Sequence, residues 1–205
     1  MSKLTRRERE KKQMQLDILH AATSIILEQG YEKLSMRKIA DIIDYSATAI
    51  YIYYKDKAAI IEGIFAEVFQ EILQRVQEVY LQQSDASPKE KLRAVIIEYI
   101  QAMVDQAPML KAVLRSGASS TLSARNPDEM EAYAGLAIIH KIIEEGIACN
   151  MFREEARHSV WVLNASILGF SQNLIESHLV EQGCWHKQRD IFLDLIFRGI
   201  YLSGG

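Results

Sequence analysis

Small and hydroxyl-bearing residues open one short segment of the chain, Ser46-Ala47-Thr48-Ala49, and Arg37 lies shortly before it. Hydroxyl groups can bond base edges, and the methyl groups of alanine and threonine can contact thymine. Small side chains also let the backbone approach DNA closely. None of the four is an Arg, Asn or Gln, the residues that make bidentate base contacts. We therefore expect sparse direct base reading here and assign the strongest base or phosphate contact to Arg37.

Aromatic residues and a lysine follow this segment, at Tyr51, Tyr53, Tyr54 and Lys57. A tyrosine ring can pack on its helix while the hydroxyl bonds a phosphate. Lys57 lies where the next helix is predicted to begin, so its ammonium and the nearby N–H groups can hold a phosphate. The alternative is that the tyrosines are core aromatics. We favour a phosphate contact for Tyr51 and a core position for Tyr54.

The elements that must position these residues are helices, because apolar residues recur with helical spacing throughout. A helix is predicted over 10–29, ended by Gly30, and two short helices follow the N-caps Ser35 and Ser46 with a tight turn between them. This is the helix-turn-helix pattern. Its last helix, here about 46–53, would lie in the major groove of DNA.

The rest of the chain also predicts helices, and no strand alternation is found. The fold class is therefore all-α: a three-helix helix-turn-helix DNA-binding domain followed by a helical ligand-binding and dimerisation domain. The predicted domains are 1–56, a connecting helix 57–82 capped by Asp56, and 83–205 after a linker at 82–88. Within the last domain we expect helices over 88–105, from 108, and over about 128–148, 154–181 and 186–202, with a surface loop at 116–127.

Charge is unevenly distributed along the 205 residues, whose net charge is −3. Residues 1–57 carry 11 Lys and Arg against 8 Asp and Glu, whereas 58–205 carry 13 against 19. A basic N-terminal arm leading into a mildly basic domain suits phosphate contact. A solvated, frayed terminus is the other interpretation.

Several function classes are excluded or disfavoured by the sequence. Cys149 and Cys184 make neither a disulfide framework nor a zinc site, and no metal or cofactor motif is present. Neither a membrane-spanning stretch nor a signal peptide is found, which predicts a cytoplasmic protein. The common enzyme fingerprints are absent. A helical ligand-binding or adaptor protein with weakened DNA binding stays as the alternative, because the base-reading face is sparse.

Residues 12–65 resemble the DNA-binding region of the TetR family of regulators. The landmarks are Gly30-Tyr31 after the first helix, Arg37-Lys38-Ile39-Ala40 after a serine cap, and the tyrosine–aromatic–aromatic–Lys signature ending at Lys57. Three positions depart from the pattern: Asp44 replaces the turn glycine, Tyr45 a small apolar residue, and Ala49 a threonine. The resemblance implies operator contacts at Arg37, Ser46, Ala47, Thr48, Ala49, Tyr51, Tyr53 and Lys57.

The resemblance also implies a dimeric regulator, usually a repressor and less often an activator, that a small molecule releases from a palindromic double-stranded operator. The resemblance places an apolar effector pocket between the fourth helix and the helices that follow it. Methionines and aromatics suit such a pocket, although they suit an ordinary core as well. The candidate lining residues are Tyr99, Met103, Met109, Leu110, Leu114, Tyr133, Ala137, His140 and Trp161. His140 faces a ligand or is a satisfied buried histidine, and we favour the latter.

Two late helices carry apolar residues with 3-4 spacing that suits packing against another helix pair. We expect them to form the four-helix interface of a homodimer, with Ala165, Gly169 and Gly199 allowing close approach. The alternative is that both rows face the core of their own subunit. The predicted interface residues are Leu163, Ile167, Phe170, Leu174, Phe192, Leu195, Gly199 and Leu202.

Overall fold

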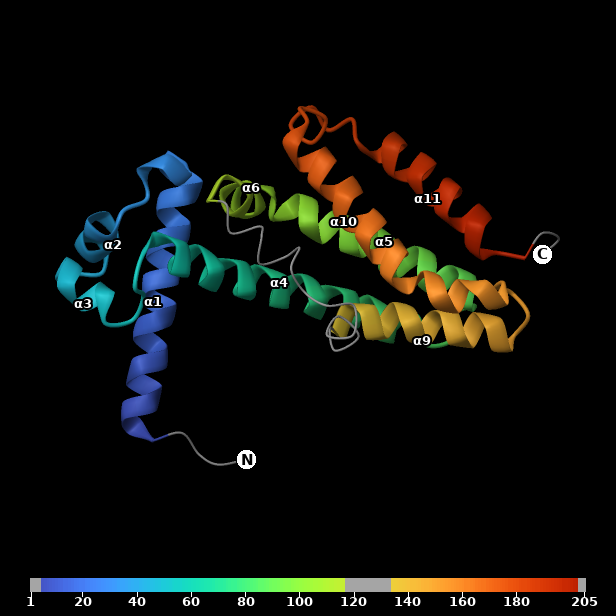
Figure 1. The fold of residues 1–205 in the computed structure, drawn as a ribbon, viewed down its shortest axis with the longest axis horizontal. Coiled ribbons are helices and arrows are strands. Elements are labelled where there is room, and N and C mark those ends of the chain that lie inside the picture. The colour runs from blue at the N-terminus through green and yellow to red at the C-terminus, as the bar shows by residue number, and fades with distance from the viewer. Residues whose placement is uncertain (1–4, 117–133, 203–205) are drawn as a thin grey trace. The chain divides into compact units, whose positions relative to one another are not determined.

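The computed structural model describes residues 5–116 and 134–202, apart from the side chains of 134–136. The elements are α1 (Arg6–Gln29), η1 (Tyr31–Lys33), α2 (Met36–Ile42), α3 (Ala47–Tyr51), α4 (Lys57–Gln82), α5 (Pro88–Asp105), α6 (Ala107–Ser116), α9 (Ala134–Ala148), η2 (Glu154–Ser159), α10 (Val160–Glu176) and α11 (His186–Ile200) (Figure 1). These ranges contain no strand, and a lone bridge joins Phe152 to Tyr201. The all-α fold class is confirmed.

The chain divides into two compact units. Unit 1 comprises residues 1–68 and 108–123, and unit 2 comprises 69–107 and 124–205. The long helix α4 therefore contributes its first half to unit 1 and its second half to unit 2. No helix within the described ranges is long and apolar enough to cross a membrane.

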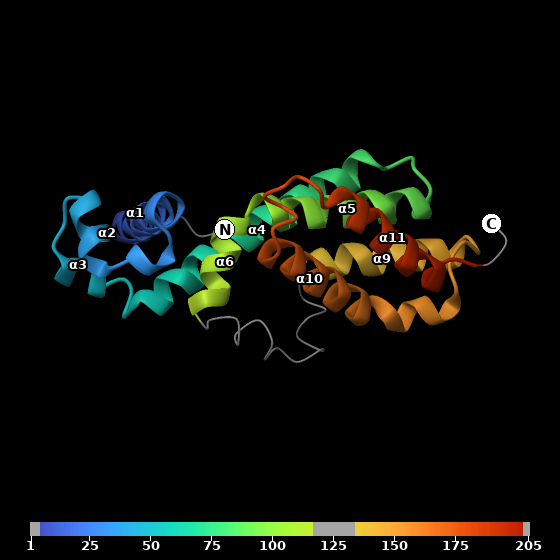
Figure 2. The same cartoon turned by 90° about the horizontal axis from the view of Figure 1, so that it is seen from above.

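Unit 1 is built on α1, against which η1 and α2 pack, while α3 packs on α2 (Figure 2). Its interior is a layer of isoleucines and alanines contributed by α1 to α4, which includes Ile18, Ala22, Ile39, Ile50 and Ile60. Close approach of α1 and α4 requires a glycine. A Cβ on Gly63 would lie 2.9 Å from a methyl carbon of Leu19 and 3.3 Å from the ring of Tyr54.

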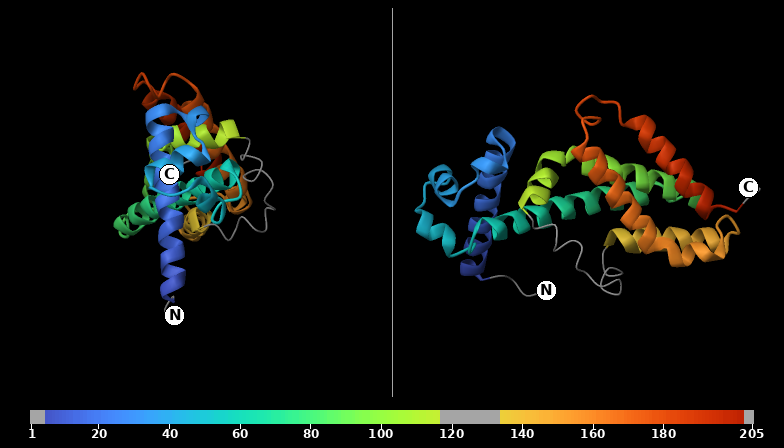
Figure 3. Two further views of the ribbon diagram at one scale, coloured as in Figure 1. Left: turned by 90° about the vertical axis from the view of Figure 1, so that its left-hand side faces the viewer. Right: turned by 45° about the horizontal axis from the view of Figure 1, so that its top comes forward.

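In unit 2, α5 packs against both α9 and α10, and η2 connects the latter two (Figures 2 and 3). The chain end returns to this group because Arg153 N–H donates to the Ile200 carbonyl and Leu202 N–H to the Met151 carbonyl. Phe152 is buried at that corner. A Cβ at Gly146 would overlap its ring, so only glycine fits there.

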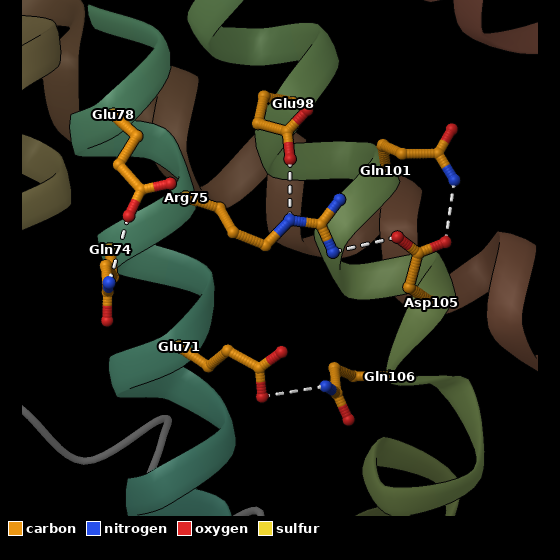
Figure 4. Close-up of polar contacts among 8 residues, drawn as sticks. All are labelled: Glu71, Gln74, Arg75, Glu78, Glu98, Gln101, Asp105 and Gln106. Atoms are coloured by element: carbon orange, nitrogen blue, oxygen red, sulfur yellow. Dashed lines mark hydrogen bonds and ion pairs between the residues drawn. The ribbon is translucent and has the colours of Figure 1, made fainter. Parts of the chain in front are cut away.

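A polar cluster joins the second half of α4 to α5 (Figure 4). Arg75 Nε donates to Glu98 Oε1 at 2.7 Å, and Arg75 Nη1 donates to Asp105 Oδ2 at 2.8 Å. Partial burial lowers the pKa of the Arg75 guanidinium. The hydrogen bonds and negative charges of Asp105 and Glu98 outweigh this effect, so the pKa is raised overall. Gln106 on the turn after α5 donates to Glu71 at 3.1 Å. These contacts fix how α5 lies along this part of α4.

The predicted helix ends agree with the structure where a cap is encoded locally. Ser35, Ser46, Asp56 and Ser87 each accept a hydrogen bond from a backbone N–H three residues ahead. Two helices outside the α2–turn–α3 segment differ from the expectation by several residues. The first helix begins at Arg6 and not near residue 10, because Thr5 and Glu8 form a capping box.

The second difference is the helix expected over 154–181, which is η2 followed by α10 and ends at Glu176. Hydrogen bonds within residues 177–184 form turns there, beginning with Leu179 N–H to the Ser177 hydroxyl. The loop expected at 116–127 lies outside the described residues except for Ser116, which ends α6.

Candidate functional site

The α2–turn–α3 segment has the geometry of a tight, capped turn. Asp44 has a φ of 58°, a left-handed conformation that aspartate tolerates better than most residues. The next N–H, of Tyr45, donates to the Ala40 carbonyl at 2.9 Å. Ser46 then accepts from the Ala49 N–H at 3.1 Å and begins α3. The observed helix ends at Tyr51 and is shorter than the predicted 46–53.

The predicted DNA-contact residues lie largely on the outer surface of this segment. Arg37, Ser46, Thr48 and Tyr51 are exposed, with Tyr51 at 53% of its full accessibility. The set of half-buried residues is Ala47, Ala49, Tyr53 and Lys57. Ile50 is the buried residue of α3 and fixes which side faces inward. The structure therefore exposes hydroxyls, a guanidinium and a phenol along the α2–turn–α3 segment.

Tyr54 and Lys57 have neighbours within unit 1. Tyr54 is half-buried, and burial, followed by the nearby Glu67 carboxylate, raises the pKa of its phenol. Lys57 Nζ donates to the Tyr31 carbonyl at 2.9 Å and lies 3.6 Å from the centre of the Tyr31 ring. Lysine has three N–H donors, so this contact leaves donors for another acceptor.

The basic N-terminal arm is helical from Arg6 onward. Thr5 N–H and its hydroxyl both donate to Glu8, and these hydrogen bonds lower the pKa of the Glu8 carboxyl. Arg6 pairs with Glu10. Arg7, Arg9, Lys11 and Lys12 are all exposed on the first turns of α1. The capping box therefore stabilises this segment as a helix. Its composition alone was also compatible with a frayed terminus.

Sequence reasoning missed three exposed apolar side chains beside the predicted contacts. Ile52, directly after α3, is 76% exposed, and Ile42 and Tyr45 are about half exposed. Tyr45 had a signal, because it stands where relatives carry a small apolar residue. Ile52 had no such signal, because it stands within a run of aromatic residues and nothing in the sequence indicates that it lies after the helix and is exposed.

Comparison with known proteins agrees with this geometry. Residues 18–64 match the family described as bacterial regulatory proteins, tetR family. Residues 18–64 are therefore similar to the DNA-binding segment of this family. Together with the curated relative described next, this match identifies the chain as a DNA-binding transcription regulator and not an enzyme.

Relatives extend beyond the N-terminal segment. The fatty acid metabolism regulator protein of Bacillus subtilis is 26% identical over 146 residues, which is 71% of this chain and 74% of that protein. The fold also matches a TetR-family regulator from Pectobacterium atrosepticum, with a TM-score of 0.74, 19% identity, and coverage of 98% and 99% of the two chains. A tetR family regulator from Shewanella sp. PV-4 has a TM-score of 0.62 at 16% identity, covering 92% and 98%.

The predicted effector residues are divided between the two units. Tyr99 and Met103 are buried in unit 2, whereas Met109, Leu110 and the half-buried Leu114 lie on α6, in unit 1. Tyr133 lies outside the described residues. The exposed members are Ala137, His140 and Trp161.

His140 is exposed, contrary to the favoured interpretation as a buried histidine. The buried side chains of α9 include Ile138, Ile139, Ile142 and Ile143. His140 lies on the opposite, exposed side of this helix. Its Nε2 lies 3.8 Å from Glu144 Oε1, and Glu144 also accepts from Arg157. The hydrogen bond from Arg157 lowers the pKa of the Glu144 carboxyl.

The predicted dimer residues separate into three sets by their burial. Leu163, Ile167 and Leu174 are buried inside unit 2, so the row predicted on α10 faces the core of its own subunit. Phe170 and Phe192 are half-buried and stack with ring centres 4.2 Å apart. The exposed set is Leu195, Gly199 and Leu202, and a Cβ on Gly199 would meet nothing within 4 Å.

The other side of α10 offers an apolar surface, of which the prediction included only Ala165 and Gly169. Trp161, Val162 and Ala165 are exposed, and a Cβ on Gly169 would meet nothing within 4 Å. On α11, Ile191 is exposed one turn before Leu195. The row on α10 was assigned to the wrong side because both sides of that helix are apolar.

Proposed function

We propose that the chain is a repressor that binds a palindromic operator as a homodimer and leaves it when a small apolar effector binds. The observation that carries this proposal is the exposure of Arg37, Ser46, Thr48 and Tyr51 on a capped helix-turn-helix. In this arrangement the last helix enters the major groove, and two copies read half-sites about 34 Å apart.

Each contact residue has a proposed role. Arg37 bonds a base edge or a phosphate, while the hydroxyls of Ser46 and Thr48 bond base edges. Ala47 and Ala49 keep the backbone close to the groove. The phenols of Tyr51 and Tyr53 and the ammonium of Lys57 bond phosphates. The exposed cations of α1 add sequence-independent attraction to the phosphate backbone.

The effector is proposed to be lipophilic. The interior of unit 2 supports this, because its buried side chains are almost entirely apolar and include Tyr99 and Met103. The similarity to a regulator named for fatty acid metabolism points the same way. To act as a near-complete switch, such an effector must favour the DNA-free conformer by about 5 kcal/mol.

Dimerisation is proposed to use the exposed apolar residues of α10, of α11 and of the short segment after α11. Exposed apolar side chains that cluster on neighbouring helices are typical of interaction surfaces. The residues are Trp161, Val162, Ile191, Leu195 and Leu202, with Gly169 and Gly199 permitting close helix approach.

The test is selection of bound fragments from the source genome by the purified protein at about 150 mM salt, where non-specific phosphate binding is weak. We expect recovery of a palindromic site. The Arg37→Ala/Tyr51→Phe double variant should bind it at least tenfold more weakly, because each lost contact of this kind costs about 1 kcal/mol or more. Repression is then measured by transcription in vitro from a promoter that carries the site.

A matched control is Arg157→Ala, which removes an exposed guanidinium from unit 2 and should leave operator affinity unchanged. If the folded dimer recovers nothing above non-specific background, even after extraction of bound lipids, the repressor proposal is wrong. The ligand-binding or adaptor alternative would then replace it.

A further inference from the structure

Two buried hydroxyl groups, one on α5 and one on α10, lack good hydrogen-bond acceptors. Tyr99 on α5 is fully buried, and burial raises the pKa of its phenol, which stays protonated. Its hydroxyl donates to Asn164 Oδ1 on α10 at 3.5 Å. Hydroxyl–oxygen hydrogen bonds are usually 2.7–2.8 Å long, so this donor is poorly satisfied.

A second donor lies farther along the same side of α10. Ser171 is fully buried, and its Oγ has no hydrogen-bond partner among the described residues. Asn164 and Ser171 are seven residues apart, which places them on one helix face about 10.5 Å apart along the axis. Ile167, also fully buried, lies between them.

The surroundings of these donors are apolar and uncharged. Asn164 and Ser171 are the buried polar residues of the described chain, and no lysine or arginine is buried with them. A buried carboxylate needs a cationic partner or several hydrogen bonds, so this site does not suit one. Met103, one turn after Tyr99, is buried and has the flexible side chain that adapts to a guest.

We propose that the effector lies along α10 between Tyr99 and Ser171 and is an elongated neutral lipid with an ester or amide carbonyl near each end. One carbonyl accepts from Tyr99 and from the Asn164 amide, the other accepts from Ser171, and the apolar body contacts Ile167. This inference rests on the proposed release by an apolar effector and assigns its chemical class. It excludes a free fatty acid whose carboxylate is buried there.

The test compares three probes that share one chain length, chosen so that the carbonyls of the extended diester lie about 10 Å apart, as the two ends of the site do: the dimethyl ester of such a dicarboxylic acid, the methyl ester of the matching monocarboxylic acid, and the free diacid. Their affinities for the full-length protein are measured from ligand-induced shifts in Tm. The diester should bind about tenfold more tightly than the monoester, and the diacid should bind most weakly.

Two substitutions test which residue binds each carbonyl end of the ligand. Tyr99→Phe should weaken both esters about tenfold, whereas Ser171→Ala should weaken the diester alone and remove its advantage over the monoester. Ser171→Ala should also leave the Tm of the free protein unchanged or higher, because it removes an unpaired buried hydroxyl. Ser166→Ala is the matched control, since the Ser166 hydroxyl on α10 already donates to the Val162 carbonyl.

Equal binding of diester and diacid, or no binding of either ester, overturns the proposal, as does a Ser171→Ala protein with wild-type preference. Ser171→Ala decides the matter even where Tyr99→Phe fails to fold. Operator binding of the ligand-free variants is measured in parallel. Operator binding without ester binding refutes this inference alone, whereas absence of operator binding by the wild type refutes the proposed function.

Discussion

The helix-turn-helix of unit 1 and the α10–α11 region of unit 2 differ in what determines which residues face outward. In unit 1, Ser46 caps α3 and the left-handed Asp44 closes the turn, so residues a few positions apart set the orientation of Thr48 and Tyr51. In unit 2, the orientation of α10 depends on contacts with α5 and α9, which are distant in sequence.

The difference shows when the spacing of apolar residues is sufficient to predict which side of a helix is buried. α3 has one buried residue, Ile50, and its other side is polar or small. α10 is apolar on both sides, with Leu163 and Ile167 buried and Trp161 and Val162 exposed. Spacing alone identifies an apolar row, and only the packing of neighbouring helices decides which row becomes the core.

The largest expected effect tests which side of α10 is the core. Leu163→Ala removes a buried side chain and should lower the free energy of unfolding of unit 2 by about 2–5 kcal/mol. Both tryptophans, Trp161 and Trp185, belong to unit 2, so tryptophan fluorescence in urea reports its unfolding.

Leu81→Ala is the matched control for that measurement. Leu81 is an exposed leucine of α4 in unit 2, and its truncation should change stability by no more than about 0.5 kcal/mol. Equal losses for the two variants would contradict the assignment of the Leu163 side to the core.

The next effect concerns the exposed side. Leu195→Lys should weaken the proposed dimer by about 2 kcal/mol, roughly a 30-fold increase in its Kd, because the lysine would place a charge in an apolar contact. Sedimentation at several concentrations measures this. Leu195 is 65% exposed, so the subunit itself should keep its fold and its tryptophan emission.

Leu27→Lys on α1 supplies the comparison in unit 1, since Leu27 is also well exposed. That variant should dimerise like the wild type. A Leu195→Lys protein that stays dimeric would move the interface away from α11.

Much of unit 1 and little of the unit 2 surface could be predicted from the sequence. The caps at Ser35, Ser46 and Ser87 are local hydrogen bonds between residues three apart, and they fixed helix starts correctly. His140 and Trp161 were misplaced for a different reason. An apolar run such as 136–143 predicts a buried helix but not which of its residues faces away from the core.

The donors of the α5–α10 contact show the same limit. Tyr99 was identified as a pocket candidate from its type, but Asn164 and Ser171 were not, because a polar residue within an apolar helix signals either exposure or a buried polar contact. Only the burial of Ser171, with no partner in the described chain, distinguishes these two cases.

A smaller effect on folding stability is expected when an ion pair is removed, and one ion pair from each unit can be compared. Arg75→Gln leaves Glu98 and Asp105 without their shared cation (Figure 4) and should destabilise unit 2 by about 1 kcal/mol, less at high salt. Arg6→Gln is the control, because the Arg6–Glu10 pair on α1 is well exposed and should contribute little. Urea denaturation at low and high salt separates the two, and equal effects would mean that the partial burial of Arg75 is unimportant.

The smallest effect asks whether Lys57 serves the fold alone or also DNA. Lys57→Met keeps the apolar stem but removes the hydrogen bond to the Tyr31 carbonyl and the charge over its ring, a loss of about 0.5–1 kcal/mol in stability. If the remaining donors bond a phosphate in each half-site, the slope of log affinity against log salt should become shallower by about 0.9 for each subunit. An unchanged slope with the same loss of stability would make Lys57 a structural residue that orients α4 against Tyr31, and the phosphate contacts would then rest on Tyr51, Tyr53 and the cations of α1.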